Sequence, residues 1–79
     1  MTYIPGQETA GQKRMRVQHN PSGMDHVNNV KLQVAELIDQ ALITSANTED
    51  GEVKRLCAIA ATELETAGMY LVKALTAGK

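Results

Sequence analysis

The chain has 79 residues, a formal net charge of −1, one cysteine, two tyrosines and neither phenylalanine nor tryptophan. A lone cysteine excludes an internal disulfide, and so small a chain without large aromatic side chains leaves oligomerisation as the remaining source of stability. The lack of a long apolar run and of a cationic, apolar leader excludes a membrane span and a secretory signal, which predicts a cytoplasmic protein.

The first part of the chain is basic, whereas the rest is acidic. Up to His19 three cations oppose one acid, and from Asn20 onward five cations oppose eight acids. The first segment contains proline and glycine among polar residues and has neither helical nor strand periodicity. We therefore predict an N-terminal basic arm over residues 1–18, extended or short-helical, followed by a helical oligomerisation and ligand-binding domain over residues 19–79.

A first long helix is predicted after this arm. Pro21 holds the residue before it out of the helical region, and the S-x-x-D spacing of Ser22 and Asp25 is typical of a helix N-terminus. The helix should begin near Gly23 and end near residues 42–43. Its apolar face at helical spacing consists of Val27, Val30, Val34, Leu37, Ile38 and Ala41.

A second long helix follows the polar linker TSANTEDG and includes the whole segment from Arg55 to Leu75. The linker is short and rich in capping residues, with Asn47 or Thr48 as the predicted cap, so the two helices should turn back on each other. The apolar face of the second helix consists of Val53, Leu56, Cys57, Ala60, Leu64, Ala67, Leu71 and Leu75. These patterns predict an all-α protein, an antiparallel two-helix hairpin that assembles as a homo-oligomer.

Several apolar side chains fall outside these two faces. Leu32 lies on the outer side of the first helix, and Ile59, Met69 and Tyr70 lie on the reverse side of the second. They predict a second buried surface, between chains. The same reverse side carries two cations and two hydroxyls, from Arg55, Thr62, Thr66 and Lys73. This polar group is either ordinary wet surface or part of an interface that holds a polar ligand.

Two small residues of the second helix favour packing roles. Cys57 falls on the apolar face, where a free thiol behaves as a small hydrophobe. Gly68 lies in mid-helix, where glycine costs about 1 kcal/mol relative to alanine. It allows close approach either by another packed element or by a flat ligand, and packing is the favoured interpretation.

The sequence lacks the spacings that catalysis or metal binding would need. His19 and His26 are separated by a proline and a helix start, and Cys57 is far along the chain. Glu63 and Glu65 are two apart on a helix and therefore diverge instead of pairing for acid–base chemistry. We predict no enzyme activity, no catalytic residue, no metal and no cofactor.

The remaining chemistry suits the binding of an anion. Arg14, Arg16 and His19 lead into the predicted helix N-terminus at Ser22, where free N–H groups favour a phosphate. Lys31 lies two turns further along, at the edge of the apolar face. Its ammonium group either extends along the surface to solvent or points into a pocket between protomers.

Two sequence blocks resemble a known family. RLCAIAATELETAGMYLVKAL, preceded by HNPSG and by a helix with Lys31 in its second turn, is similar to the small phage anti-CBASS proteins. These are cyclic-oligonucleotide sponges that share a helical hairpin with one class of anti-Thoeris protein. The resemblance covers about residues 16–75 and rests on a pattern of helix residues.

The resemblance implies a homohexamer that captures cyclic dinucleotides between protomers, in the cytoplasm of the infected bacterial host, without hydrolysing them. Some family members also hold cyclic trinucleotides at separate sites. Lys31 matches the family's phosphate-contacting lysine, and Arg55 matches an arginine associated with the trinucleotide site. The base-stacking aromatic of the family falls near His19, where this chain has no tyrosine or phenylalanine. The expected ligand-binding residues are Arg16, His19, Asn20, Lys31, Arg55 and Thr62.

Two other functions compete with the sponge. The basic segment from Lys13 to His19 is compatible with nucleic-acid binding, although the acidic body argues against a broad nucleic-acid footprint. A structural adaptor is the other alternative, in which the outer face of the hairpin binds another protein and no nucleotide is bound.

Overall fold

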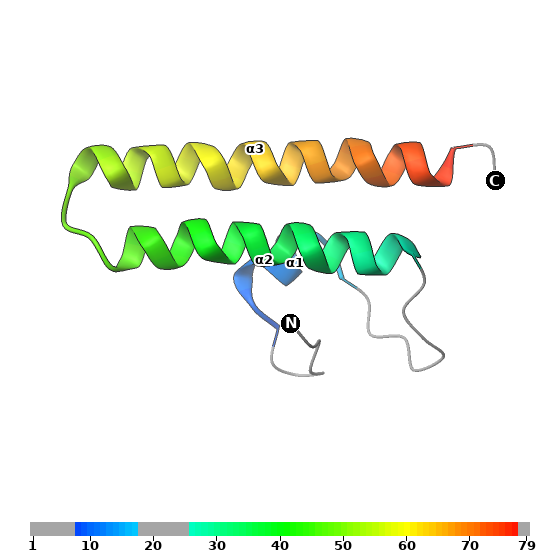
Figure 1. Ribbon diagram of the computed structural model, residues 1–79, viewed down its shortest axis with the longest axis horizontal. Helices are drawn as coiled ribbons and strands as arrows, with labels where there is room; N and C mark the ends of the chain where they lie inside the picture. Colours follow the sequence, from blue (N-terminus) through cyan, green and yellow to red (C-terminus); the bar gives the residue numbers. More distant parts are fainter. Residues whose placement is uncertain (1–7, 18–25, 78–79) are drawn as a thin grey trace.

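The computed structural model describes residues 8–17 and 26–77, and within these ranges it consists of three helices without any strand. They are α1 (Ala10–Arg14), α2 (His26–Ala46) and α3 (Gly51–Thr76). α2 and α3 lie side by side and run in opposite directions, and α1 packs mainly against α2 (Figure 1). The all-helical class is thereby confirmed. The predicted start of the first helix near Gly23 and its Ser22 cap lie outside the described residues.

α1 forms in a segment whose apolar residues show no helical periodicity, so this helix was not predicted from the apolar pattern. Its N-terminus is a capping box, in which the Thr9 hydroxyl accepts from the Gln12 N–H at 3.1 Å and the Gln12 side chain accepts from the Thr9 N–H at 3.0 Å. At the other end Arg16 adopts a left-handed φ of 55°. The Arg16 N–H donates to Lys13 O and the Val17 N–H to Gln12 O, the bonding pattern of a Schellman motif.

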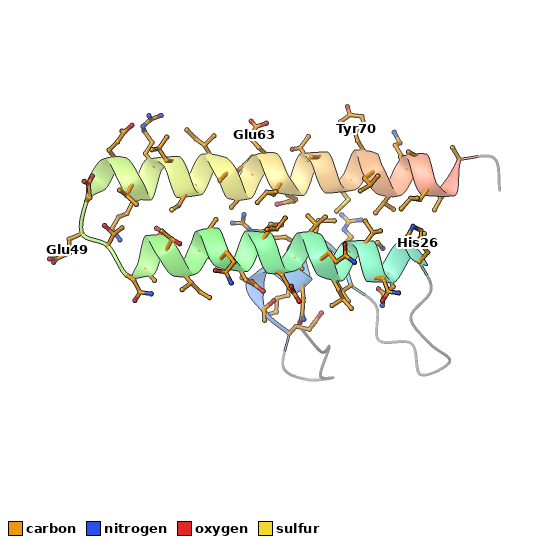
Figure 2. The ribbon with its side chains drawn as sticks, in the orientation of Figure 1. His26, Glu49, Glu63 and Tyr70 are labelled. Carbon is orange, nitrogen blue, oxygen red and sulfur yellow. The ribbon has the colours of Figure 1, made fainter. Side chains whose placement is uncertain are left out.

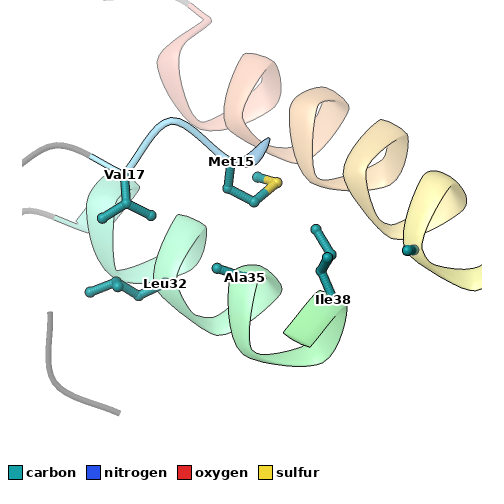
Figure 3. Close-up of a cluster of buried hydrophobic side chains, with 6 residues drawn as sticks. Met15, Val17, Leu32, Ala35 and Ile38 are labelled. Carbon is teal, nitrogen blue, oxygen red and sulfur yellow. The ribbon is translucent and has the colours of Figure 1, made fainter. Parts of the chain in front are cut away.

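The segment expected to be an arm contributes to the core. Met15 is completely buried between α2 and α3, and Val17 covers Leu32 of α2 (Figure 3). The expectation that Leu32 is covered by another chain is therefore wrong: this side chain is buried within its own chain. The reason is that α1 occupies one side of the hairpin, so that α2 needs a second apolar face.

The turn between α2 and α3 differs in detail from its prediction. α2 continues to Ala46, about a turn beyond the expected end. The cap of α3 is Asp50, whose carboxylate Oδ1 accepts from the N–H groups of Glu52 at 2.8 Å and Val53 at 3.3 Å. Thr48 instead accepts from the Asp50 N–H at 3.1 Å and so stabilises the turn before the cap.

α3 is rotated about its axis relative to the predicted apolar face. Cys57, Ala61 and Gly68 are the buried residues of this helix, which confirms the core role of Cys57. Leu56 and Leu71, both expected to be core, are 51% and 46% exposed. The rotation follows from size: small residues face α2 and Met15, so that the helices approach closely, whereas Leu56 and Leu71 are left outside.

Candidate functional site

Two of the expected binding residues come together where α1 meets α2. Lys31 is half-buried on α2, and its Nζ donates to the backbone carbonyl of Arg16 at 3.5 Å. The contact is at the long limit for a hydrogen bond, so the ammonium group keeps donor capacity for an incoming acceptor. The Arg16 side chain is exposed. The side chains of Arg16 and Lys31 therefore originate at one seam.

The local backbone explains this placement. Arg16 follows α1 directly, and its left-handed conformation turns the chain so that its carbonyl faces Lys31. Val17 then anchors the seam by packing on Leu32, the neighbour of Lys31 in α2. Within residues 8–17 and 26–77, neither Arg16 nor Lys31 forms an ion pair with an acidic side chain.

Two other cations among the described residues have contacts of their own. Arg14 lies 4.0 Å from Glu65 of α3. Lys54 donates to the Ser45 carbonyl at 2.9 Å across the turn. Arg14 therefore has an acidic partner, whereas the seam cations Arg16 and Lys31 have none among the described side chains.

Arg55 lies far from this seam and is paired. Its guanidinium donates two hydrogen bonds to Glu52, at 2.9 and 2.7 Å. This bond lowers the pKa of the Glu52 carboxyl and raises that of Arg55. Lys54 and Ser45 place this end of α3 beside the end of α2, roughly 20 Å along the hairpin from Lys31. Arg55 and Lys31 therefore cannot contact one compact ligand within a single chain.

Thr62 shares a face of α3 with Arg55, since seven residues make about two helical turns. Both side chains are exposed, and the Thr66 hydroxyl donates to the Thr62 carbonyl at 3.1 Å. The described residues thus form two separate groups, Arg16 with Lys31 and Arg55 with Thr62. The two remaining expected residues, His19 and Asn20, lie outside the described ranges.

A shallow depression of about 330 Å³ lies near the end of α3. It is lined by Met69, Tyr70, Val72, Lys73 and Thr76, and most of its lining is apolar. Tyr70 extends away from α2 into solvent (Figure 2). All five residues lie on one face of α3 at helical spacing, and the sequence interpretation assigned no binding role to Val72 or Thr76.

A further pair of residues, missed at the sequence level, determines how α1 lies on α2. The Gly11 N–H donates to the Asp39 carboxylate Oδ1 at 2.7 Å, and Asp39 is only 8% exposed. The T-x-x-Q spacing of Thr9 and Gln12 was the available signal for a helix at this position. Asp39 follows Ile38 on the apolar side of α2, and an acid in such a position indicates a buried hydrogen-bond partner.

Comparisons with protein-family models, with curated proteins and with solved structures find no match to this chain. Among the described residues no helix is both long and apolar enough to cross a membrane. In the same ranges no three His, Cys, Asp or Glu side chains are grouped as they would be around a metal ion.

Proposed function

We propose that the protein is a phage anti-defence protein that binds and sequesters cyclic dinucleotide immune signals without cleaving them. The observation that supports this most directly is the seam at which Lys31 and Arg16 meet. A cyclic dinucleotide carries two phosphates, and cations without an acidic partner among the described residues, beside a partly apolar surface, suit such a ligand. The resemblance of residues 16–75 to the anti-CBASS sponges supports the same choice.

The proposed protein acts as a homo-oligomer, with six chains as the expected number. Large apolar side chains are half-exposed on the hairpin, among them Leu37 at 53%, Leu56 and Leu71. Leu37 is two residues from both Ala35 and Asp39, which contact α1, so it points roughly 160° away from α1. The uncovered face opposite α1 suits a second copy.

A second ligand class is proposed for the other group of residues. Arg55 lies at the opposite end of the hairpin from Lys31, and Thr62 shares its exposed face about two turns further along α3. By resemblance this face binds cyclic trinucleotides where copies meet. Its arginine is held by Glu52 in the single chain, so such a ligand would have to compete with that carboxylate.

The structural adaptor stays a second candidate, because the exposed leucines also suit another protein. The two functions are separated by native mass spectrometry with cyclic di-AMP, cyclic di-GMP, cyclic GMP-AMP and a cyclic trinucleotide. The sponge should gain one dinucleotide per two chains, and proteolysis should release that ligand intact. An oligomer that takes up no nucleotide supports the adaptor, and recovery of cleaved nucleotide contradicts sequestration.

The Lys31→Ala variant tests whether Lys31 contacts the ligand. It should lower affinity for the bound cyclic dinucleotide by about tenfold or more, the loss of a charge-assisted hydrogen bond, and leave the assembly mass unchanged. Lys54→Ala is the control, since it removes an equal charge at the far end of the hairpin. Equal affinities of the two variants would remove Lys31 from the site.

A further inference from the structure

The position of α1 on α2 depends on one buried hydrogen bond and one missing side chain. Asp39 accepts from the Gly11 N–H at 2.7 Å in a buried setting. A Cβ at Gly11 would collide with the Ala35 carbonyl oxygen and would lie 2.8 Å from Asp39 Oδ1. Neither atom can yield easily, because one is helix backbone and the other is the acceptor itself. We refer to Asp39 and Gly11 as the latch.

The latch lies away from the cationic seam but is rigidly connected to it. Eight residues, about two turns of α2, separate Asp39 from Lys31. On the other side, five residues connect Gly11 to Arg16, and this stretch is fixed by the capping box, the Schellman motif and the buried Met15. A shift of Gly11 therefore moves the Arg16 carbonyl and side chain relative to Lys31.

We infer that Asp39 and Gly11 are positioning residues for the anion-binding seam, acting through α1 without touching the ligand. This inference rests on the proposed function. When the latch is closed, Arg16 and Lys31 present their charges together; when it is open, α1 leaves α2 and Lys31 alone remains. Affinity then falls in proportion to the fraction of chains in which α1 is docked.

The two oxygens of Asp39 predict how substitutions should differ. Oδ1 makes the bond to Gly11, whereas Oδ2 is buried and has no hydrogen-bond partner in the part of the chain that the structure describes. Asparagine keeps an acceptor for the Gly11 N–H, so Asp39→Asn should preserve docking. Asp39→Leu removes the acceptor and leaves the Gly11 N–H buried without a partner.

The experiment compares Gly11→Ala, Asp39→Leu and Asp39→Asn with wild type in three measurements: hydrogen exchange, cyclic dinucleotide titration and native mass. Gly51→Ala is the matched glycine control, because a Cβ there meets nothing within 4 Å. Gly11→Ala and Asp39→Leu should speed exchange over residues 10–17 and weaken binding by about tenfold, the result of docking only a tenth of the chains. Asp39→Asn and Gly51→Ala should behave as wild type, and all variants should keep exchange protection in α3.

The outcomes separate this inference from the proposed function. If wild type binds and the two latch variants bind equally well despite faster exchange over residues 10–17, the latch does not position the site and only this inference fails. If exchange over residues 10–17 is unchanged in both variants, the latch does not hold α1, and the inference fails as well. If wild type takes up none of the cyclic dinucleotides, the proposed function fails and the inference falls with it.

Discussion

Met15, the C-cap of α1, is packed directly on Gly68 of α3: a Cβ at Gly68 would lie 2.6 Å from Met15 Cε and 3.0 Å from its sulfur. This contact connects the first and last helices, which otherwise meet little. It also explains a glycine in the middle of a long helix, because a hydrogen atom in place of a side chain leaves room for the methionine.

Gly68→Ala should therefore destabilise the protein although alanine is the better helix former. The alanine methyl also meets Val34 Cγ1 at 3.0 Å, so both neighbours must move in a filled core. The steric clash should cost roughly 2 kcal/mol of folding free energy, whereas the better helix propensity of alanine should contribute about 1 kcal/mol. The variant should therefore be less stable than wild type by about 1 kcal/mol. Denaturant unfolding at fixed protein concentration measures this difference in the free energy of unfolding. Gly51→Ala serves as control, and a stabilised Gly68→Ala variant would contradict the packing account.

Arg16→Gly should separate stability from binding. Arginine at a φ of 55° occupies the left-handed region, so glycine should stabilise the end of α1 by about 0.5–1 kcal/mol. The same change removes a cation from the proposed site and should weaken cyclic dinucleotide binding. Arg16→Asn tests the assignment, because asparagine tolerates this conformation but lacks the charge. Its affinity should match that of Arg16→Gly, and wild-type affinity in both variants would exclude the Arg16 side chain from the site.

The helical class and the two long helices were accessible from the sequence because apolar spacing reports them directly. The exact face of α3 was not accessible. Its apolar residues extend around about half of the helix, and periodicity alone cannot determine which part of so wide a stripe is covered. Packing selected the part with Ala61 and Gly68, where α2 and Met15 approach most closely.

The candidate site was predictable only in part, for a related reason. Lys31 was recognised by its place at the edge of an apolar face, and Arg16 by its charge. Their meeting depends on α1, whose five residues have too little periodicity to reveal a helix. The Asp39–Gly11 contact spans 28 positions of sequence, a separation for which local rules give no partner.

The pair formed by Glu52 and Arg55 should make a pH-dependent contribution to the stability of the start of α3. The hydrogen bond from Arg55 lowers the pKa of Glu52 in the folded state below its ordinary value of 4.5. A lowered folded-state pKa means that the stabilisation is present above pH 4.5 and is lost as the pH falls through the folded-state value. Both groups are solvent-exposed, so the effect on unfolding should be small. A carboxyl NMR titration measures it directly: Arg55→Ala should return Glu52 to its ordinary pKa, and no change would contradict the pairing.

The exposed face opposite α1 should control assembly. Leu71→Glu introduces a charge at a side chain that is 46% exposed in the single chain, so the hairpin should stay folded, with a cost within about 1 kcal/mol. If a second copy covers this face, the same charge would be buried on association and the oligomer should dissociate. Sedimentation velocity measures the mass, and circular dichroism checks the fold. Ala58→Glu, at an exposed residue about 140° around α3 from Leu71, controls for charge alone. Retention of full mass by Leu71→Glu would place the interface elsewhere.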